Sequence, residues 1–184
     1  DFNGDGYGDI VIGAPGADLG NGRAYVLFGN ESWSELSFDV SDLENTSHAG
    51  LVLAGTEGGT AQYTGKPVAK AGDVNADGFD DVLVGSPAAG TSSQGYAFVV
   101  FGGEDLPATL DLESDLTGSN GMVFKGAITG EHTDRVGYAV SGDFDVNGDG
   151  VSDIVIGAPE GGTTGALNGE VYIVFGQVSY AFPP

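Results

Sequence analysis

Several residue types on which other proteins depend are missing or scarce in this sequence. It contains no cysteine, which excludes disulfides, thiolate metal sites and cysteine nucleophiles. Only 5 residues are Lys or Arg against 27 Asp and Glu, so the formal net charge is −22. That charge argues against nucleic acids and anionic membrane surfaces as partners, because both are bound through clustered cations. Apolar runs of about 18 residues are also missing, which argues against direct membrane insertion as a helix.

Glycine, by contrast, is abundant. There are 34 glycines in 184 residues without the every-third-residue period of collagen, so many tight backbone turns are expected. Hydrophobic residues make up 40% of the chain and charged residues 17%, which predicts a folded domain rather than a disordered acidic chain. The apolar segments are short and none has a sustained helical period, so we predict an all-β fold.

An internal repeat is the most informative feature of the sequence. Asp1, Asp73 and Asp145 each open an acidic, glycine-containing run, and both intervals between them are 72 residues. Each run leads into a short apolar segment that ends in Gly-Ala-Pro or Gly-Ser-Pro. These segments are 10–15, 82–87 and 154–159. Apolar residues at successive positions predict a strand that is covered on both faces.

Three further types of strand recur along the chain. They are short apolar segments, many of them rich in aromatic and β-branched residues, as strands are. They fall at 24–29, 96–102 and 171–176, at 50–55 and 121–126, and at 67–71 and 137–141. Four strands per repeat are typical of a β-propeller blade, and 184 residues hold about two and a half repeats of 72.

These lengths predict how the blades divide the chain. As one repeat domain over 1–184, it would hold a partial blade at 1–60, a complete blade at 61–130 and a partial blade at 131–184. A closed propeller typically needs four to eight blades. The chain is therefore expected to be either a piece of a longer protein or a subunit that other chains complete.

The acidic runs share the pattern D-x-N-x-D-G-x-x-D. Side-chain oxygens at positions 1, 3, 5 and 9, with a backbone carbonyl at position 7, are the hard oxygen donors that Ca²⁺ takes, and glycine at position 6 permits the sharp turn around an ion. Position 12 is apolar where an EF-hand has Glu, so the loops are not EF-hands. We predict up to three calcium ions, one per loop. The predicted ligands are Asp1, Asn3, Asp5, Tyr7 and Asp9; Asp73, Asn75, Asp77, Phe79 and Asp81; and Asp145, Asn147, Asp149, Val151 and Asp153, with Tyr7, Phe79 and Val151 acting through their backbone carbonyls.

These motifs carry a family resemblance. The three loops, Gly13-Ala14-Pro15 with its counterparts, and the run Gly72-Asp73-Val74-Asn75-Ala76-Asp77-Gly78 resemble the FG-GAP repeat family, found in the integrin α-subunit β-propeller and in large repetitive bacterial surface proteins. Leu110-Asp111-Leu112 and Gly118-Ser119-Asn120-Gly121 are more similar to the bacterial branch. The resemblance implies four-stranded antiparallel blades in which the calcium loop joins the first two strands, so that 67–72 and 137–142 would be innermost strands.

Catalysis is the main competing class of function. Paired carboxylates can cleave glycosidic bonds, but nearly every clustered Asp belongs to a predicted calcium loop, and Glu31, Glu57 and Glu160 are not paired in the sequence. His48 and His132 are single histidines without a nucleophile motif, and we interpret both as exposed loop residues. The 5 basic residues are dispersed and are expected to form local ion pairs. We therefore predict a protein that is not an enzyme.

The function predicted from the sequence is structural and adhesive. The chain would be a calcium-binding propeller segment of an extracellular or cell-surface protein, secreted from the cell, whose partner is a protein or a glycan. One alternative is a self-assembling fibre or sheath subunit, in which copies of the chain complete one another by strand exchange. Another is the accessory propeller of a secreted hydrolase.

Overall fold

The fold is described from a computed structural model, which places residues 1–31, 40, 43, 49–55, 61–129, 132–162 and 167–178. Within these residues the regular structure is almost entirely β-strand, with a short 3-10 turn, η1 (Asp18–Gly20), before β2 (Arg23–Leu27). The all-β prediction is confirmed. None of the helical structure in these residues has the length and apolar character that a membrane crossing requires.

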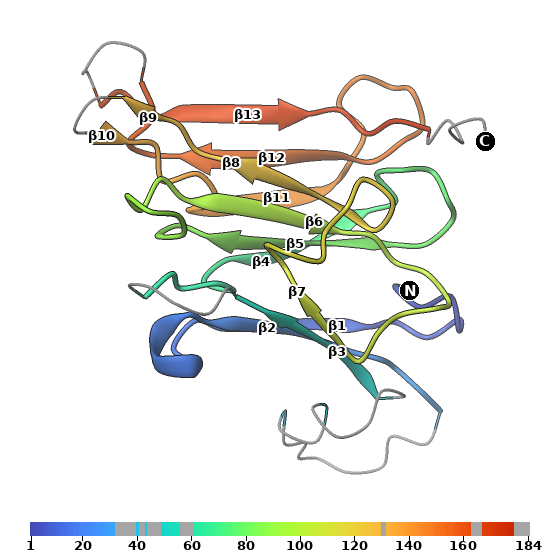
Figure 1. Cartoon of the computed structure of the whole chain (residues 1–184). Helices are drawn as coiled ribbons and strands as arrows, with labels where there is room; N and C mark the ends of the chain where they lie inside the picture. Colours follow the sequence, from blue (N-terminus) through green and yellow to red (C-terminus); the bar gives the residue numbers. More distant parts are fainter. Residues whose placement is uncertain are drawn as a thin grey trace.

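Three sheets are stacked in chain order, as Figure 1 shows. The first contains β1 (Ile10–Ala14), β2 (Arg23–Leu27), β3 (Gly50–Ala54) and β7 (Thr109–Asp111). The second contains β4 (Val68–Gly72), β5 (Asp81–Ser86), β6 (Tyr96–Val100) and β8 (Gly121–Lys125). The third contains β11 (Ala139–Phe144), β12 (Asp153–Ala158) and β13 (Glu170–Val174), and a small hairpin pairs β9 (Ile128–Thr129) with β10 (His132–Thr133).

The second sheet is a complete blade of the kind that the repeat predicts. Its strands lie in the order β4-β5-β6-β8 and every neighbouring pair is antiparallel. The two predicted innermost strands are found as β4 and β11, and each is followed by an acidic loop that leads to β5 or β12. All six residues of β5 are buried, as its continuous apolar run predicts.

One strand departs from the predicted blade. β7 belongs to the connection between β6 and β8, but it pairs in parallel with β3 at the outer edge of the first sheet, with Leu53 opposite Leu110. The Val52 N–H donates to the Ala108 carbonyl and the Leu112 N–H to the Ala54 carbonyl, both at 3.0 Å. A segment of the second repeat thus closes the edge of the first sheet, because an unpaired edge exposes backbone donors and acceptors.

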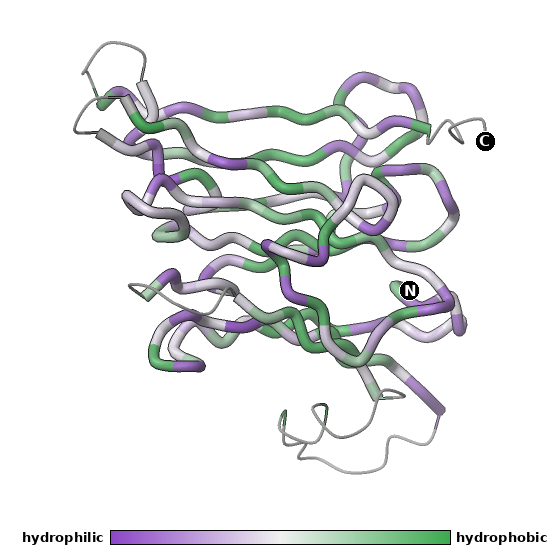
Figure 2. The backbone as a smooth tube through the Cα atoms, viewed as in Figure 1, coloured by the Kyte–Doolittle hydropathy of each residue, from purple (hydrophilic) through white to green (hydrophobic). Residues whose placement is uncertain are grey.

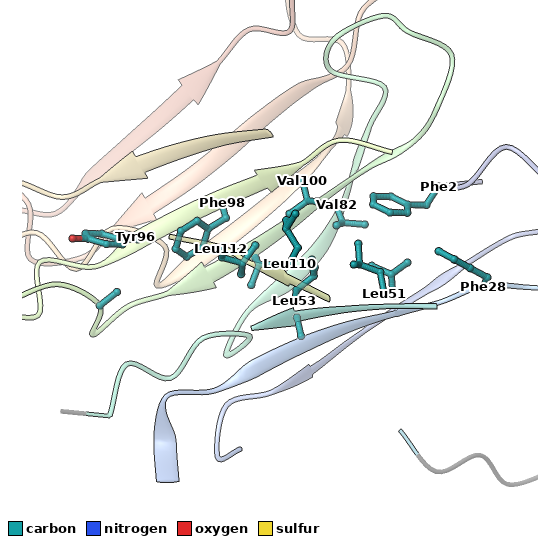
Figure 3. Close-up of a cluster of buried hydrophobic side chains, with 14 residues drawn as sticks. Phe2, Phe28, Leu51, Leu53, Val82, Tyr96, Phe98, Val100, Leu110 and Leu112 are labelled. Atoms are coloured by element: carbon teal, nitrogen blue, oxygen red, sulfur yellow. The ribbon is translucent and has the colours of Figure 1, made fainter. Parts of the chain in front are cut away.

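The core lies between the sheets rather than inside any one of them. Figure 3 shows Leu51 and Leu53 of the first sheet facing Phe98 and Val100 of the second, with Leu110 and Leu112 between them. A second cluster joins the middle and third sheets through Leu83, Val99 and Ile156 among others. Hydrophobic segments therefore lie along the strands, and polar segments lie in the loops at both ends of the strands, as Figure 2 shows.

Glycine in the Gly-x-Pro motif permits close approach of adjacent sheets. A Cβ on Gly13 would lie 2.0 Å from the Gly65 carbonyl oxygen, and one on Gly85 would lie 2.2 Å from the Gly137 carbonyl oxygen. Both glycines therefore pack directly against the backbone that leads into the next sheet. Gly157, in the third sheet, has no atom nearer than 3.5 Å to such a Cβ. The motif is thus a contact point between neighbouring blades, not only a turn.

Candidate calcium loops

The three acidic loops lie on the same side of the stacked sheets, where the strands end on the right in Figure 1. The first spans residues 1–9 and precedes β1, the second joins β4 to β5, and the third joins β11 to β12. The ligand positions that are separated by 72 residues in the sequence therefore recur at equivalent places in successive sheets.

Hydrogen bonds within each loop repeat with the same spacing. In the second loop Asp73 Oδ2 accepts the Gly78 N–H at 2.9 Å, Asn75 Oδ1 accepts the Asp77 N–H at 3.1 Å, and Asp77 Oδ1 accepts the Phe79 N–H at 3.0 Å. The corresponding bonds are present in the first and third loops. Short Asp and Asn side chains form such turns readily because their oxygens reach backbone N–H groups a few residues ahead.

Glycine is needed at position 6 for a backbone reason. Gly6, Gly78 and Gly150 have φ values of 88°, 95° and 87°, in the left-handed region that costs other residues energy. In the third loop the Gly150 N–H, followed by those of Gly148 and Asp149, lowers the pKa of Asp145 by stabilising its ionised form. The turn of the third loop therefore favours the charged form of Asp145.

The position-9 carboxylate has a role that the sequence interpretation missed. Asp81 Oδ2 accepts the Val74 N–H at 2.8 Å and its Oδ1 accepts the Gly102 N–H at 3.0 Å. Asp9 and Asp153 make the same two bonds, to the N–H groups of Phe2 and Gly29 and of Val146 and Gly176. Each carboxylate thus links the start of its own loop to a Phe-Gly pair further along the chain. For Asp81 that pair is Phe101-Gly102, which follows β6.

The signal for this contact was present in the sequence. Phe28-Gly29, Phe101-Gly102 and Phe175-Gly176 recur about twenty residues after each position-9 Asp, but the spacing alone does not say that the glycine N–H meets that carboxylate. Asp81 is fully buried, and burial raises the pKa of its carboxyl to about 7 against the lowering effect of the Val74 and Gly102 N–H groups.

The loops supply the chemistry of a calcium site, although the ligand assignment stays a prediction. Each offers Asp, Asn and backbone carbonyl oxygens, the hard donors that suit Ca²⁺. The described part of the chain contains no cluster of three or more His, Cys, Asp or Glu side chains that could hold a metal ion by themselves. Asn75 and the carbonyl of Phe79, with their counterparts, would therefore have to contribute alongside the carboxylates.

Arg23, Lys70 and Arg135 form ion pairs, but Lys70 and Arg135 do so with residues far along the chain rather than locally. Arg23 pairs with Asp18 and Arg135 with Glu160, the latter at 3.2 Å. Lys70 Nζ lies 3.3 Å from both Asp80 and Asp143, so it joins the second sheet to the third. Burial lowers the pKa of Lys70, but the hydrogen bonds and charges of Asp143 and Asp80 outweigh it and raise the pKa overall.

The remaining candidates from the sequence are scattered. Glu160 is the ion-pair partner of Arg135. His132 lies in the short strand β10 rather than in a loop, so that interpretation was wrong about its setting. Glu31 lies near the start of the connection from β2 to β3, whereas His48 and Glu57 lie outside the described residues.

Comparison with known proteins gives a consistent picture. The FG-GAP repeat model matches residues 1–27, 68–100 and 136–174, which contain the three loops and the strands that follow them. Integrin alpha pat-2 of Caenorhabditis elegans is 36% identical over 103 residues, which are 56% of this chain and 8% of that protein. Phosphatidylinositol-glycan-specific phospholipase D of Bos taurus is 31% identical over 188 residues, covering 98% of this chain and 20% of that protein.

A third relative, integrin alpha-PS5 of Drosophila melanogaster, is 32% identical over 168 residues, or 86% of this chain and 14% of that protein. The chain thus spans at most a fifth of the length of these relatives. The family model covers more than half of the chain and its three matches coincide with the three repeats that were derived from the sequence. The chain belongs to the FG-GAP repeat family and consists of blades of the β-propeller type.

Proposed function

We propose that this chain is a calcium-stabilised segment of an FG-GAP β-propeller in an extracellular or cell-surface protein, with a structural and adhesive role and no catalytic one. The observation that carries the proposal is one loop geometry that occurs three times, once in each sheet, on the same side of the stack. The exposed loops between strands would contact a protein or glycan ligand, and the loops with calcium would keep those surfaces in place.

The ligands of each ion would be the side-chain oxygens at positions 1, 3, 5 and 9 and the carbonyl at position 7. A bound ion supplies positive charge that offsets the repulsion among the carboxylates of the loop. The position-9 carboxylate already receives two backbone N–H groups, so it would link the ion to the strand ends. Residues 1–60, 61–130 and 131–184 would be a partial, a complete and a partial blade.

Calcium titration of the full chain tests this proposal. Isothermal calorimetry in metal-free buffer is expected to show up to three sites, and calcium at a hundred times its Kd should raise the free energy of unfolding by about 2.7 kcal/mol per site. EDTA should reverse the rise. The absence of binding heat together with unchanged melting would overturn the proposal.

A matched pair of variants separates ligation from general charge. Asp77→Asn alters a predicted ligand, whereas Asp105→Asn removes the same charge from an exposed position outside the loops. We expect the Asp77 variant to lose one site and the Asp105 variant to keep the stoichiometry of the unmodified chain. Equal behaviour of the two would mean that calcium only screens the acidic surface.

The accessory propeller of a secreted hydrolase remains the second candidate. It is favoured by the alignment with phosphatidylinositol-glycan-specific phospholipase D, which runs over 98% of this chain. The coding sequence on either side of this segment distinguishes the two candidates: a neighbouring hydrolase domain supports the accessory role, and further FG-GAP repeats alone support the adhesive one.

A further inference from the structure

The interface between the first and second sheets differs from the next interface by one strand. At the first interface β7 lies along β3, with Leu110 and Leu112 buried between the two sheets. At the second interface the strand equivalent to β3 is β8, which is the last strand of its sheet. In the first sheet, Val52 and Ala54 of β3 bond to the β7 segment. The equivalent groups of β8 are the N–H of Val123 and the carbonyl of Lys125, and within the described residues no strand lies beside them.

The space beside β8 is open and apolar. A pocket of about 450 Å³ is lined by Val123, Phe124 and Lys125 of β8, by Tyr172, Ile173 and Val174 of β13, and by Ala127, Asp134, Val136 and Ile156. The equivalent side chains of the first interface are covered: Leu51, Leu53, Phe98 and Val100 are buried there, in one cluster with Leu110 and Leu112. The pocket thus occupies the position that β7 fills one repeat earlier.

The sequence of β7 explains what the position requires. Leu110 and Leu112 alternate with Thr109 and Asp111, so both leucines point into the core while Asp111 faces outward. Asp111 Oδ1 accepts the N–H groups of Glu113 and Ser114 at 2.9 Å, which closes the turn after the strand. An apolar–Asp–apolar triplet therefore supplies both the buried side chains and the turn.

This triplet is itself a repeated feature. Phe38-Asp39-Val40 has the same pattern, and it begins 9 residues after Gly29, much as Leu110 begins 8 residues after Gly102. The first two repeats thus each bring one such triplet after their Phe-Gly pair, and β7 shows that the triplet of the second repeat is delivered to the edge of the preceding sheet.

We propose that the outer edge of β8 and the adjoining pocket are a binding site for an extended polypeptide segment of the apolar–Asp–apolar type, supplied by the part of an FG-GAP repeat that follows its Phe-Gly pair and added parallel to β8 in the register of β7. The two apolar side chains would enter the pocket between β8 and β13. In that register the donor Asp falls opposite Lys125, as Asp111 falls opposite Ala54, so its charge complements the edge. The site depends on edge pairing and not on calcium, and it does not require the proposed adhesive role.

A synthetic peptide with the sequence of residues 105–118 is the direct probe. Fluorescence anisotropy with the full chain is expected to show saturable binding, and the same peptide with both leucines changed to Ser should bind at least tenfold more weakly, because the pocket loses its apolar occupants. Equal affinity of the two peptides, or no binding of either, would overturn the proposal.

Two variants of the chain test the edge itself. Val123→Pro removes an N–H that the proposed register pairs with the donor and leaves the bonds of β8 to β6 in place; Lys125→Glu reverses the complementary charge. We expect the first to weaken peptide binding at least tenfold and the second about threefold at low salt. Thermal melting shows whether Val123→Pro still folds, and Lys125→Glu decides the matter if it does not: unchanged affinity in Lys125→Glu counts against the register.

Disulfide trapping separates this site from displacement of β7. The chain has no cysteine, so Lys125→Cys creates a single thiol. A peptide with Cys in place of Asp111 should cross-link to it several-fold faster than one with Cys in place of Thr109. Preferential cross-linking to an Ala54→Cys chain instead would place the peptide at β3 and overturn the proposal. If the free chain forms oligomers that the peptide dissociates, the edge is confirmed and the donor is a second copy.

Discussion

The middle of the stack and its two ends carry the same sequence pattern but differ in burial. All five residues of β6 are buried, and Ala97 and Val99 have no exposed surface. At the equivalent positions of β13, Val171 is 69% exposed and Ile173 is 54% exposed. The strands pair in the same register in both sheets. The difference therefore comes from the presence or absence of a neighbouring sheet, not from the local sequence.

The comparison between interior and end positions predicts unequal effects of identical substitutions. The largest difference is expected for Ile154→Ala and Ile10→Ala, since both isoleucines follow the position-9 Asp but Ile154 is 1% exposed and Ile10 is 57% exposed. The first should lower the free energy of unfolding by about 2–5 kcal/mol through the cavity it leaves, and the second by about 0.5 kcal/mol or less. Urea denaturation of both variants measures this, and similar losses would show that burial in the stack does not control stability.

The position-9 carboxylates should follow the same order. Asp81→Ala leaves the N–H groups of Val74 and Gly102 without their acceptor, at a cost of about 2–4 kcal/mol, because unsatisfied buried donors are expensive. Asp9 makes the matching bonds but is only partly buried, so Asp9→Ala should cost less. Both are measured in EDTA, so that loss of calcium does not contribute. A larger loss for Asp9 than for Asp81 would contradict the structural role of burial.

The motif glycines provide a smaller and more local test. Gly85→Ala would place a Cβ 2.2 Å from the Gly137 carbonyl oxygen, and relief of that overlap should cost about 1–3 kcal/mol. Gly157→Ala meets no atom within 3.5 Å, so it should be nearly neutral in this chain. The two variants are compared by thermal melting. If a further sheet packs on the third in a longer chain, Gly157→Ala should become as harmful there as Gly85→Ala is here.

The ion pairs of Lys70 should have the smallest effect. Lys70→Met leaves Asp80 and Asp143 without their shared cation, but all three side chains are partly exposed, so the loss should be below about 1 kcal/mol. Because such pairs are screened by salt, the difference from the unmodified chain should shrink in 1 M NaCl. A large loss that persists in high salt would mean that Lys70 also contributes through packing.

Much of the fold could be predicted because it is local and repeated. The 72-residue interval, the short apolar segments and the Gly-x-Pro motif together predict three sheets of β-strands, and the strands lie where they were expected within a few residues. The loops were equally predictable, because Asp, Asn and Gly at fixed spacing form turns through their own side chains and backbone. The three calcium ions themselves stay a prediction.

Two features of the site and fold were not predicted. The bond from Gly102 to Asp81 joins residues 21 apart, and the bonds that β7 makes to β3 join residues more than fifty apart. From its sequence, β7 looks like part of its own blade. Pairing partners at such distances depend on which sheet edge is open, and that is a property of the assembled stack.

The sequence by itself determined the repeat, the strand positions and the chemistry of the loops, because each arises from neighbouring residues along the chain. Only the tertiary structure decided which repeated positions are buried, which strand closes the edge of the first sheet and why Gly13 and Gly85 must be glycine. Those properties depend on what packs against each sheet, and identical segments acquire different neighbours as the sheets stack.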